Sequence, residues 1–156
     1  MLLELLQANG ARMDVLCKCL EKLLCAEDAD SRQILRGPDG ARMLLENDGV
    51  TLQWIGWDRR GTANVLVEHD GTYTLTARQQ VDNGQGSLAM DGYISEIGPG
   101  YFTFRGTITI EGAPDRGRYC SENKLWHFAV TQNRRYWRLR EFEWCDDLTD
   151  YIDIYM

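Results

Sequence analysis

From Arg42 to the C-terminus, apolar and polar residues alternate with a period of two, as in strands that bury one face. Clusters rich in Gly, Asn, Asp and Pro interrupt the alternation, and such clusters are typical of β-turns. Together these turn signals predict about 8–9 strands joined by short loops, which is an antiparallel meander. The clusters are NDG at 47–49, DRRG at 58–61, HDG at 69–71, DNGQG at 82–86, GPG at 98–100, GAPDRG at 112–117, QN at 132–133 and CDD at 145–147.

The N-terminal segment has a different pattern, with apolar residues spaced three and four apart. This spacing predicts an amphipathic helix, which Asn9-Gly10 limits to about residues 12–26. The helix packs on the sheet or pairs in a homodimer, and both alternatives stay open. A second short helix is predicted within DADSRQILRGPDG (28–40), ending at Gly37-Pro38. The apolar positions of the first helix are Leu2, Leu6, Met13, Leu16, Leu20 and Leu23.

These patterns predict one domain over residues 1–156, of the α+β class but mostly β. A helical segment (1–36) packs on a strongly bent antiparallel sheet or barrel (42–156). Closure is expected because unpaired strand edges favour aggregation. The arrangement resembles a calycin- or lipocalin-like barrel, and this resemblance concerns architecture alone.

The hairpin around GPG tests this interpretation. Centring it on Pro99 pairs Ile94 with Phe104 and Tyr93 with Arg105. The first pair belongs to a wholly apolar face and the second to a polar face. Such a clean separation of the two faces supports the predicted strands.

The last two hairpins can be aligned in the same way. Centring them on the QN and CDD clusters places Leu139 between Trp126 and Ile154 on the apolar face. The same alignment sets Arg140 opposite Asp153 on the polar face. The arginines and aspartates of residues 134–155 are therefore expected to pair across neighbouring strands.

Composition narrows the classes of function. The net charge of −7 argues against binding to nucleic acid or to an anionic membrane surface. No apolar run approaches the roughly 20 residues of a membrane-spanning helix. Five cysteines, three of them crowded at Cys17, Cys19 and Cys25, predict reduced thiols in the cytoplasm and not a disulfide framework.

Sequence motifs for catalysis and cofactors are absent. No phosphate-binding loop, metal-ligand spacing or nucleophile motif occurs in the chain, so no cofactor, metal site or catalytic residue is expected. His69 precedes a turn and is expected to be exposed. His127 lies within a predicted strand, where a structural role competes with proton transfer or ligand contact.

One group of polar side chains stands out. If the barrel encloses the polar face, these guanidinium, phenol and imidazole groups form a pocket for a small anionic or aromatic ligand. The alignment also places Arg138 between His127 and Tyr155. The candidate ligand-binding residues are His127, Arg138, Arg140, Tyr136, Tyr155, Tyr93 and Arg105.

Three functions remain open. The main prediction is a cytosolic protein that binds a small organic ligand in its barrel. The alternative is a protein-interaction or homodimeric module that acts through the N-terminal helix or a sheet face. The third is an enzyme that uses His127 with a nearby arginine or tyrosine.

Overall fold

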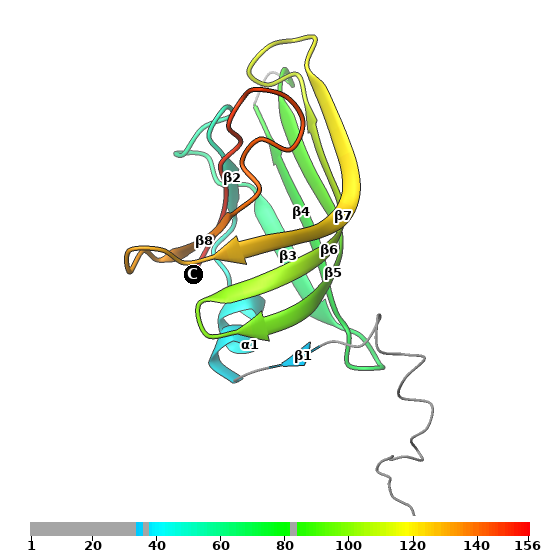
Figure 1. Ribbon diagram of the computed structural model, residues 1–156, viewed down its shortest axis with the longest axis vertical. Coiled ribbons are helices and arrows are strands. Elements are labelled where there is room, and N and C mark those ends of the chain that lie inside the picture. Colours follow the sequence, from blue (N-terminus) through cyan, green and yellow to red (C-terminus); the bar gives the residue numbers. More distant parts are fainter. Residues whose placement is uncertain (1–33, 36–37, 82–83) are drawn as a thin grey trace, which may run out of the picture. The chain divides into compact units, whose positions relative to one another are not determined.

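The computed structural model describes residues 34–35, 38–81 and 84–156 (Figure 1). The helix predicted over 12–26, with its leucines, lies outside these residues. The described elements are β1 (Ile34–Leu35), α1 (Pro38–Leu45), β2 (Val50–Leu52), β3 (Thr62–Val67), β4 (Tyr73–Gln80), β5 (Ser87–Gly98), β6 (Tyr101–Glu111), β7 (Tyr119–Ala129), β8 (Tyr136–Leu139) and β9 (Ile152–Tyr155).

Strands β2 to β9 form one antiparallel sheet in the order β2-β9-β8-β7-β6-β5-β4-β3, and β1 pairs in parallel with β5 outside this order. The sheet curls until β2 meets the segment just before β3. There the Gly61 N–H donates to the Val50 carbonyl at 2.8 Å, and the Val50 N–H donates to the Gly61 carbonyl at 3.2 Å. The predicted mostly antiparallel, barrel-shaped fold is therefore confirmed, with closure that is nearly complete.

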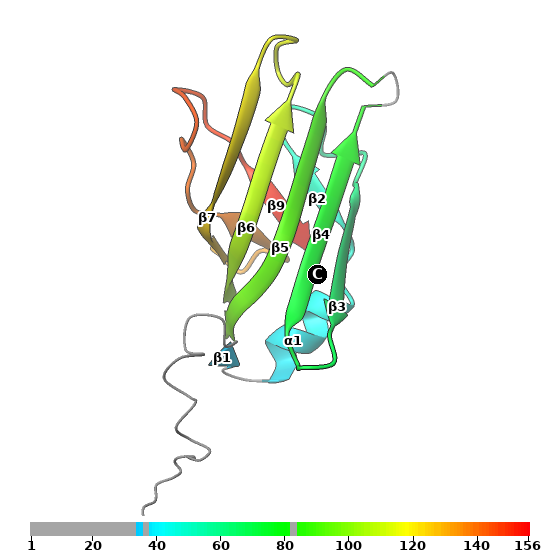
Figure 2. The same ribbon diagram turned by 90° about the vertical axis from the view of Figure 1, so that its right-hand side faces the viewer.

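The apolar face of the sheet is the enclosed one. In β4, Leu75 and Ala77 are buried, whereas Thr76 and Arg78 between and beside them are exposed. Burying each large apolar side chain contributes about 1.5–3 kcal/mol. The long strands β4, β5 and β6 run side by side and supply much of this wall (Figure 2).

Large aromatic side chains fill part of the interior. Phe102 stacks on Phe128 with 4.8 Å between ring centroids and meets Trp137 edge-on at 5.6 Å. Trp126 is also fully buried, and its Nε1–H donates to the Gly106 carbonyl at 2.9 Å. Because all four rings are buried, they occupy space that a ligand inside the barrel would need.

The predicted hairpin between β5 and β6 is confirmed. Ile94 pairs with Phe104 and Tyr93 with Arg105, as the alignment on Pro99 requires. The register shifts by one residue at Ser95, so that Glu96 and not Ser95 is the partner of Thr103. This irregularity is a β-bulge close to the turn.

The predicted registers of β7–β8 and β8–β9 are wrong by two residues each. Leu139 pairs with Phe128 and not with Trp126, and Arg138, not Arg140, pairs with Asp153. The turn at 132–133 was placed correctly, since the Arg134 N–H donates to the Thr131 carbonyl at 3.1 Å. β8, the strand that follows this turn, pairs with β7 two residues away from the predicted alignment. A shift of two keeps every side chain on its predicted face.

The expectations for residues 28–45 need correction. Ile34–Leu35 form a short strand instead of helix, and α1 begins at Pro38 where the predicted helix was to end. Proline favours the first turn of a helix because its missing N–H needs no partner there. The helix also extends over residues 42–45, which the period-two pattern had assigned to the sheet.

The expectation of reduced thiols is wrong for one pair of cysteines. Cys120 at the start of β7 and Cys145 in the loop 140–151 form a disulfide, with Cα atoms 5.8 Å apart. Cys17, Cys19 and Cys25 lie outside the described residues.

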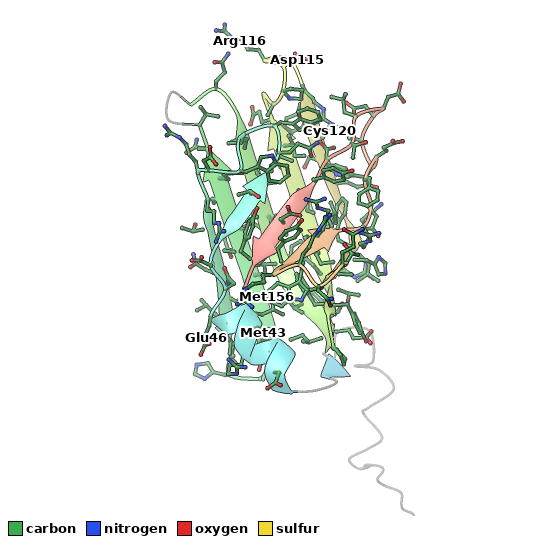
Figure 3. The ribbon with its side chains drawn as sticks, turned by 90° about the vertical axis from the view of Figure 1, so that its left-hand side faces the viewer. Met43, Glu46, Asp115, Arg116, Cys120 and Met156 are labelled. Atoms are coloured by element: carbon green, nitrogen blue, oxygen red, sulfur yellow. A yellow bond between two sulfur atoms is a disulfide. The ribbon has the colours of Figure 1, made fainter. Side chains whose placement is uncertain are left out.

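The two ends of the barrel are built differently. Met43 of α1 and Glu46, which follows the helix, lie at one end, and Asp115 and Arg116 of the loop 112–117 lie at the other (Figure 3). Within the described part of the chain, no helix has the length and apolar character needed to cross a membrane.

Candidate functional site

Six of the seven candidate residues from the sequence lie in strands, on the polar face of the sheet, which is the outer face of the barrel. The seventh, Arg140, follows the end of β8. The structure brings three of the seven together, namely Arg138, Tyr136 and Tyr155. His127 and Arg140 lie apart from these three, each with its own partner. Tyr93 and Arg105 face each other across β5 and β6.

Arg138 is the centre of the first group. Its Nε and Nη2 donate to the two carboxylate oxygens of Asp153 at 2.7 and 2.8 Å. The guanidinium also lies over the ring of Tyr151 at 4.1 Å and near that of Tyr136 at 5.1 Å. The hydrogen bonds that Arg138 donates to Asp153 raise the pKa of Arg138, although burial opposes this. Arg138 is thus bound within the protein by a buried carboxylate.

Tyr155 links this group to the neighbouring loop. Its hydroxyl shares a hydrogen bond of 2.8 Å with Thr51 Oγ1, and the Arg60 guanidinium lies 3.8 Å above its ring. Burial raises the pKa of Tyr155, while the bond with Thr51 acts in the opposite direction. Arg60 is therefore held against the outer face of β9.

His127 and Arg140 have partners outside this group. Glu141 accepts from the backbone N–H of His127 at 3.0 Å, and its second oxygen lies 2.6 Å from His127 Nδ1. The Arg140 guanidinium lies 4.9 Å from the ring of Phe142. Both His127 and the predicted turn residue His69 are exposed.

A groove of about 600 Å³ lies beside the start of β3 and is the most promising binding site. Three arginines are among its lining residues, and among the described residues it has no carboxylate in its lining. The volume is in the range of small-molecule sites. The groove is lined by Arg59, Arg60, Gly61, Thr62, Arg78, Gln79, Gln80, Ser87, Leu88 and Ala89, and we call this set the arginine groove.

The groove exists because β3 begins opposite Arg78, whereas β4 extends to Gln80. Thr62, the first residue of β3, pairs with Arg78, whereas β4 continues to Gln80 and pairs there with Ser87 of β5. Gly61 lets the chain approach β4 closely, since a Cβ at this position would lie 1.9 Å from the Arg78 carbonyl oxygen. The end of β4 is thereby left uncovered by β3.

A buried glutamine holds the arginine-bearing loop against the barrel wall. Gln79 Oε1 accepts from the Leu52 N–H at 2.7 Å. Its Nε2 donates to the carbonyls of Gly56 at 3.0 Å and Arg59 at 2.8 Å. These bonds fix the backbone of the loop 53–60 at the point where Arg59 and Arg60 enter the groove.

The arginines of the groove also contact acidic residues nearby. Arg60 bonds Asp48 at 2.6 Å and Arg78 bonds Asp91 at 3.0 Å, and all four side chains are substantially exposed. Arg78 also donates to the carbonyls of Ala77 at 2.8 Å and Met90 at 3.2 Å. A guanidinium has five N–H donors, so part of them remains for a ligand. Exposed pairs of this kind contribute little to stability, and a stronger anion can compete for them.

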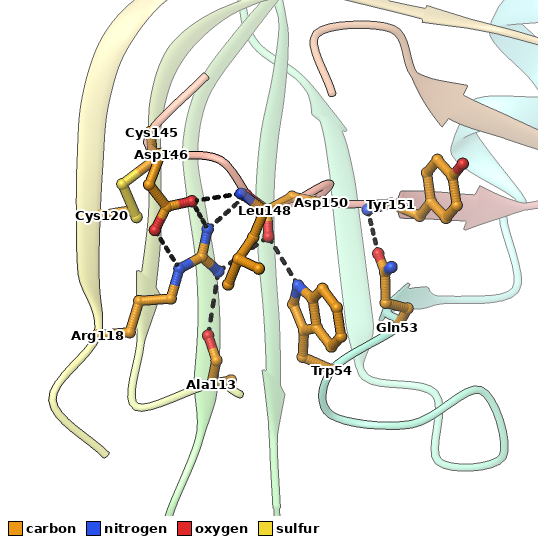
Figure 4. A network of polar contacts seen from close by, with 10 residues as sticks. All are labelled: Gln53, Trp54, Ala113, Arg118, Cys120, Cys145, Asp146, Leu148, Asp150 and Tyr151. Carbon is orange, nitrogen blue, oxygen red and sulfur yellow. Dashed lines mark hydrogen bonds and ion pairs between the residues drawn. A yellow bond between two sulfur atoms is a disulfide. The ribbon is translucent and has the colours of Figure 1, made fainter. Parts of the chain in front are cut away.

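A second network fixes the loop 140–151 (Figure 4). Arg118 donates to both oxygens of the buried Asp150 side chain, with both contacts at 2.9 Å, and to those of Asp146 at 2.8 and 2.9 Å. Its Nη1 also donates to the Ala113 carbonyl at 3.1 Å. The two aspartates raise the pKa of Arg118, and Arg118 in turn lowers the pKa of Asp146.

The same region holds three potential metal-ligand atoms, from Cys120, Cys145 and Asp146, within 4.8 Å of one another. Both sulfurs belong to the disulfide and have no thiolate to offer a metal. The group therefore has one ligand, which is too few for a metal site.

The sequence interpretation missed the arginine groove. Two signals pointed toward it: a pair of adjacent arginines in the DRRG turn, and Gln79 in an apolar position of an alternating strand. A buried glutamine needs polar partners, so its position indicated a loop folded over the strand. Which loop this is depends on tertiary contacts that the pattern does not contain.

Comparisons with known proteins agree on one family. The PM1083 family model matches residues 27–156 of the chain. The uncharacterised protein PM1083 of Pasteurella multocida (strain Pm70) is 36% identical over 114 residues, which are 72% of this chain and 72% of that protein. No solved structure matches the chain.

Proposed function

The chain belongs to the PM1083 family, and we propose that it is a small-molecule-binding protein that takes an anionic organic ligand in the arginine groove. The ligand class follows from the charge of the lining. A carboxylate or phosphate group accepts two parallel hydrogen bonds from one guanidinium, which gives both affinity and orientation. The polar groups of Thr62, Gln80 and Ser87 supply further contacts to the rest of the ligand.

One observation carries the proposal: three arginines line a groove without a described carboxylate in its lining, in a chain with a net charge of −7. A positive site on an acidic protein selects anions locally while the surface as a whole repels them. This combination favours small anions, which reach the groove, over extended polyanions, which also meet the acidic surroundings.

Binding is tested by calorimetry and thermal unfolding of the full chain with inorganic phosphate, citrate, benzoate and an uncharged alcohol. Chloride at matched ionic strength controls for general salt effects. We expect at least one of the anions to bind and to raise the melting temperature, because a ligand at 100 times its Kd stabilises the native state by about 2.7 kcal/mol.

Matched variants locate the site. Arg59→Gln and Arg78→Gln should each weaken anion binding by about tenfold or more, which is the loss of one charge-assisted contact. Arg116→Gln is the control, because Arg116 is exposed in the loop 112–117 and does not line the groove. Equal losses in the groove variants and in Arg116→Gln, or no anion binding at all, would refute the proposal.

An interaction module is the second candidate function. Leu66 and Val67 on β3 are 60% and 50% exposed, which is unusual for adjacent large apolar residues. Their side chains point to opposite faces of β3, so a partner would have to bind along this strand and protect its backbone amides from hydrogen exchange. The proposal does not extend to catalysis, because His127 bonds Glu141 and does not line the groove.

We place this activity in the cytoplasm, in keeping with the acidic composition. Cell fractionation with an antibody to the full chain tests the compartment. Recovery outside the cytoplasm would contradict this part of the proposal and leave the groove unaffected.

A further inference from the structure

The disulfide lies in the loop that also carries the buried ion pair. Cys120 is buried at the start of β7, whereas Cys145 is exposed in the loop 140–151. Asp146 and Asp150, the two partners of Arg118, follow Cys145 in the same loop. A covalent bond and an ion-pair network thus hold one loop against the barrel (Figure 4).

This loop contacts the segment that carries the groove arginines. The Trp54 Nε1–H donates to Asp150 Oδ1 at 2.9 Å. The Tyr151 N–H donates to the side-chain oxygen of Gln53. Gln53 and Trp54 begin the segment 53–60, which ends with Arg59 and Arg60. The segment therefore has two anchors, Gln79 on the barrel wall and the disulfide-bonded loop.

We propose that Cys120–Cys145 is a reversible thiol–disulfide site, and that its oxidation state sets the anion affinity of the arginine groove. The second part of this inference rests on the proposed function. Oxidation fixes the loop 140–151, and through Asp150 and Tyr151 it fixes the segment 53–60. Reduction leaves the ion pairs and the hydrogen bonds as the remaining anchors of the loop, so Arg59 and Arg60 are held less rigidly.

The chemical step is an exchange with a dithiol reductant. Its thiolate attacks Sγ of Cys145, the exposed residue of the pair, and the disulfide bond breaks with Cys120 leaving as a thiolate that takes up a proton. The second thiol of the reductant then attacks the mixed disulfide and releases Cys145. The protein gains two electrons and two protons, and the reductant becomes a disulfide.

Asp146 belongs to the same site. Its carboxylate lies within 4.8 Å of both sulfurs, and Arg118 offsets its charge. The negative charge of Asp146 disfavours a thiolate beside the disulfide and so slows the exchange. The positive charge of Arg118 reduces this repulsion. Asp146→Asn should therefore speed the attack of a thiolate reductant on the disulfide.

The first experiment uses the full chain and does not depend on a ligand. Peptide mapping without reductant should recover Cys120 linked to Cys145. Hydrogen exchange read by mass spectrometry is then compared before and after dithiothreitol. Faster exchange in both 140–151 and 53–60 supports the inference, and unchanged exchange in 53–60 overturns the coupling. Free thiols at both positions after air oxidation overturn the redox site itself.

Variants separate the coupling from a general loss of stability. Cys145→Ser should exchange like the reduced protein with or without dithiothreitol. Trp54→Phe keeps the disulfide but removes the bond to Asp150, so reduction should change exchange in 53–60 less than it does in the parent. A Trp54→Phe protein that responds fully to reduction would show that Asp150 does not transmit the change.

Calorimetry with phosphate and citrate then tests the link to binding. We expect the reduced protein to bind the anions at least about fivefold more weakly than the oxidised protein, which is at the lower end of known couplings between sites. Equal affinities of both forms overturn the regulatory inference. If the oxidised protein binds neither anion, the proposed function fails, and the exchange data still decide whether the disulfide controls the segment 53–60.

Discussion

Asp150 is a completely buried carboxylate whose charge is matched by Arg118, which is itself 6% exposed. Removing one partner of a buried ion pair leaves the other charge without compensation, at a cost of about 3–5 kcal/mol. We therefore expect Arg118→Ala to lower the free energy of unfolding by this amount. Denaturant unfolding measures it.

The control for this variant is Arg42→Ala. Arg42 contacts Asp39 and Glu46 on the surface of α1, and all three side chains are at least 60% exposed. Its loss should change stability by less than about 0.5 kcal/mol. Similar losses in Arg118→Ala and Arg42→Ala would contradict the structural role assigned to the buried pair.

Asp146 should make stability depend on pH in the acid range. Its hydrogen bond with Arg118 lowers its pKa below the ordinary 3.8, so the unfolded state binds the proton more tightly than the folded state. The contribution is complete above the ordinary pKa and is lost as the pH falls through the lower folded value.

The measurement compares the unfolding free energies of the parent and Asp146→Asn between pH 7 and pH 2. The difference between them should be constant at neutral pH and shrink at the acid end. Asp115→Asn, in the exposed loop 112–117, is the control for the loss of one surface charge. A difference that grows on acidification would reverse the assigned sign.

The ion pair between Arg138 and Asp153 shows why the partners in such pairs are hard to predict from a sequence. The alternating charges of residues 134–155 correctly predicted that an arginine and an aspartate pair across β8 and β9. The partner of Asp153 is nevertheless Arg138 and not Arg140, because both lie on the same face two residues apart. Periodicity identifies the face, and only the register selects the partner.

Among the structural elements, the approach of Gly61 to β4 is the most sensitive to substitution. A Cβ at Gly61 would lie 1.9 Å from the Arg78 carbonyl oxygen, and a shift of the Gly61 backbone away from Arg78 would disturb its two hydrogen bonds with Val50. Gly61→Ala should therefore destabilise the protein by about 1–3 kcal/mol and open the barrel between β2 and β3.

Gly117→Ala is the matched control, because nothing lies within 4 Å of a Cβ at that position. It should change the unfolding free energy by less than about 0.5 kcal/mol. Thermal unfolding compares the two variants, and hydrogen exchange at Val50 reports the opening. Equal unfolding free energies of the two variants would show that the close approach of Gly61 to β4 does not contribute to stability.

Strands in which apolar and polar residues alternate regularly could be predicted from the sequence. The register between such strands could be predicted only where a tight turn joins them. β5 and β6 meet at a tight turn, so Pro99 was enough to define their register apart from the bulge. Between Phe142 and Asp150 the chain instead folds back through a long loop, held by the Asp150 N–H bond to the Phe142 carbonyl at 2.8 Å. The prediction assumed a tight hairpin centred on Asp146-Asp147, and this assumption gives the wrong register when the strands are joined by a long loop.

For the whole molecule, the N-terminal segment gives a prediction that lies outside the described residues. If the apolar stripe of residues 12–26 packs on the barrel or in a dimer, Leu20→Ala should cost roughly 2–5 kcal/mol. A melting temperature that rises with protein concentration would indicate the homodimer. A loss below about 0.5 kcal/mol would show that this helix is not part of any core.

The arginine groove could not be predicted from the sequence, because it depends on how distant segments of the whole molecule meet. It joins the DRRG turn to the end of β4 and the start of β5, which the sequence separates by some twenty residues or more. The period-two pattern identified each strand but not that β3 begins late enough to leave the end of β4 uncovered. The size of that gap depends on Gly61 and Gln79, whose contacts are purely tertiary.

The pairing of β2 with β9 has a consequence for synthesis on the ribosome. Thr51 and Tyr155, which share a hydrogen bond, are 104 residues apart in the chain. At about 5–20 residues per second, β2 emerges roughly 5–20 s before its neighbour exists. Val50 and Leu52 stay without their final partners in that interval, so nascent chains that stall before residue 152 should be bound by chaperones or degraded.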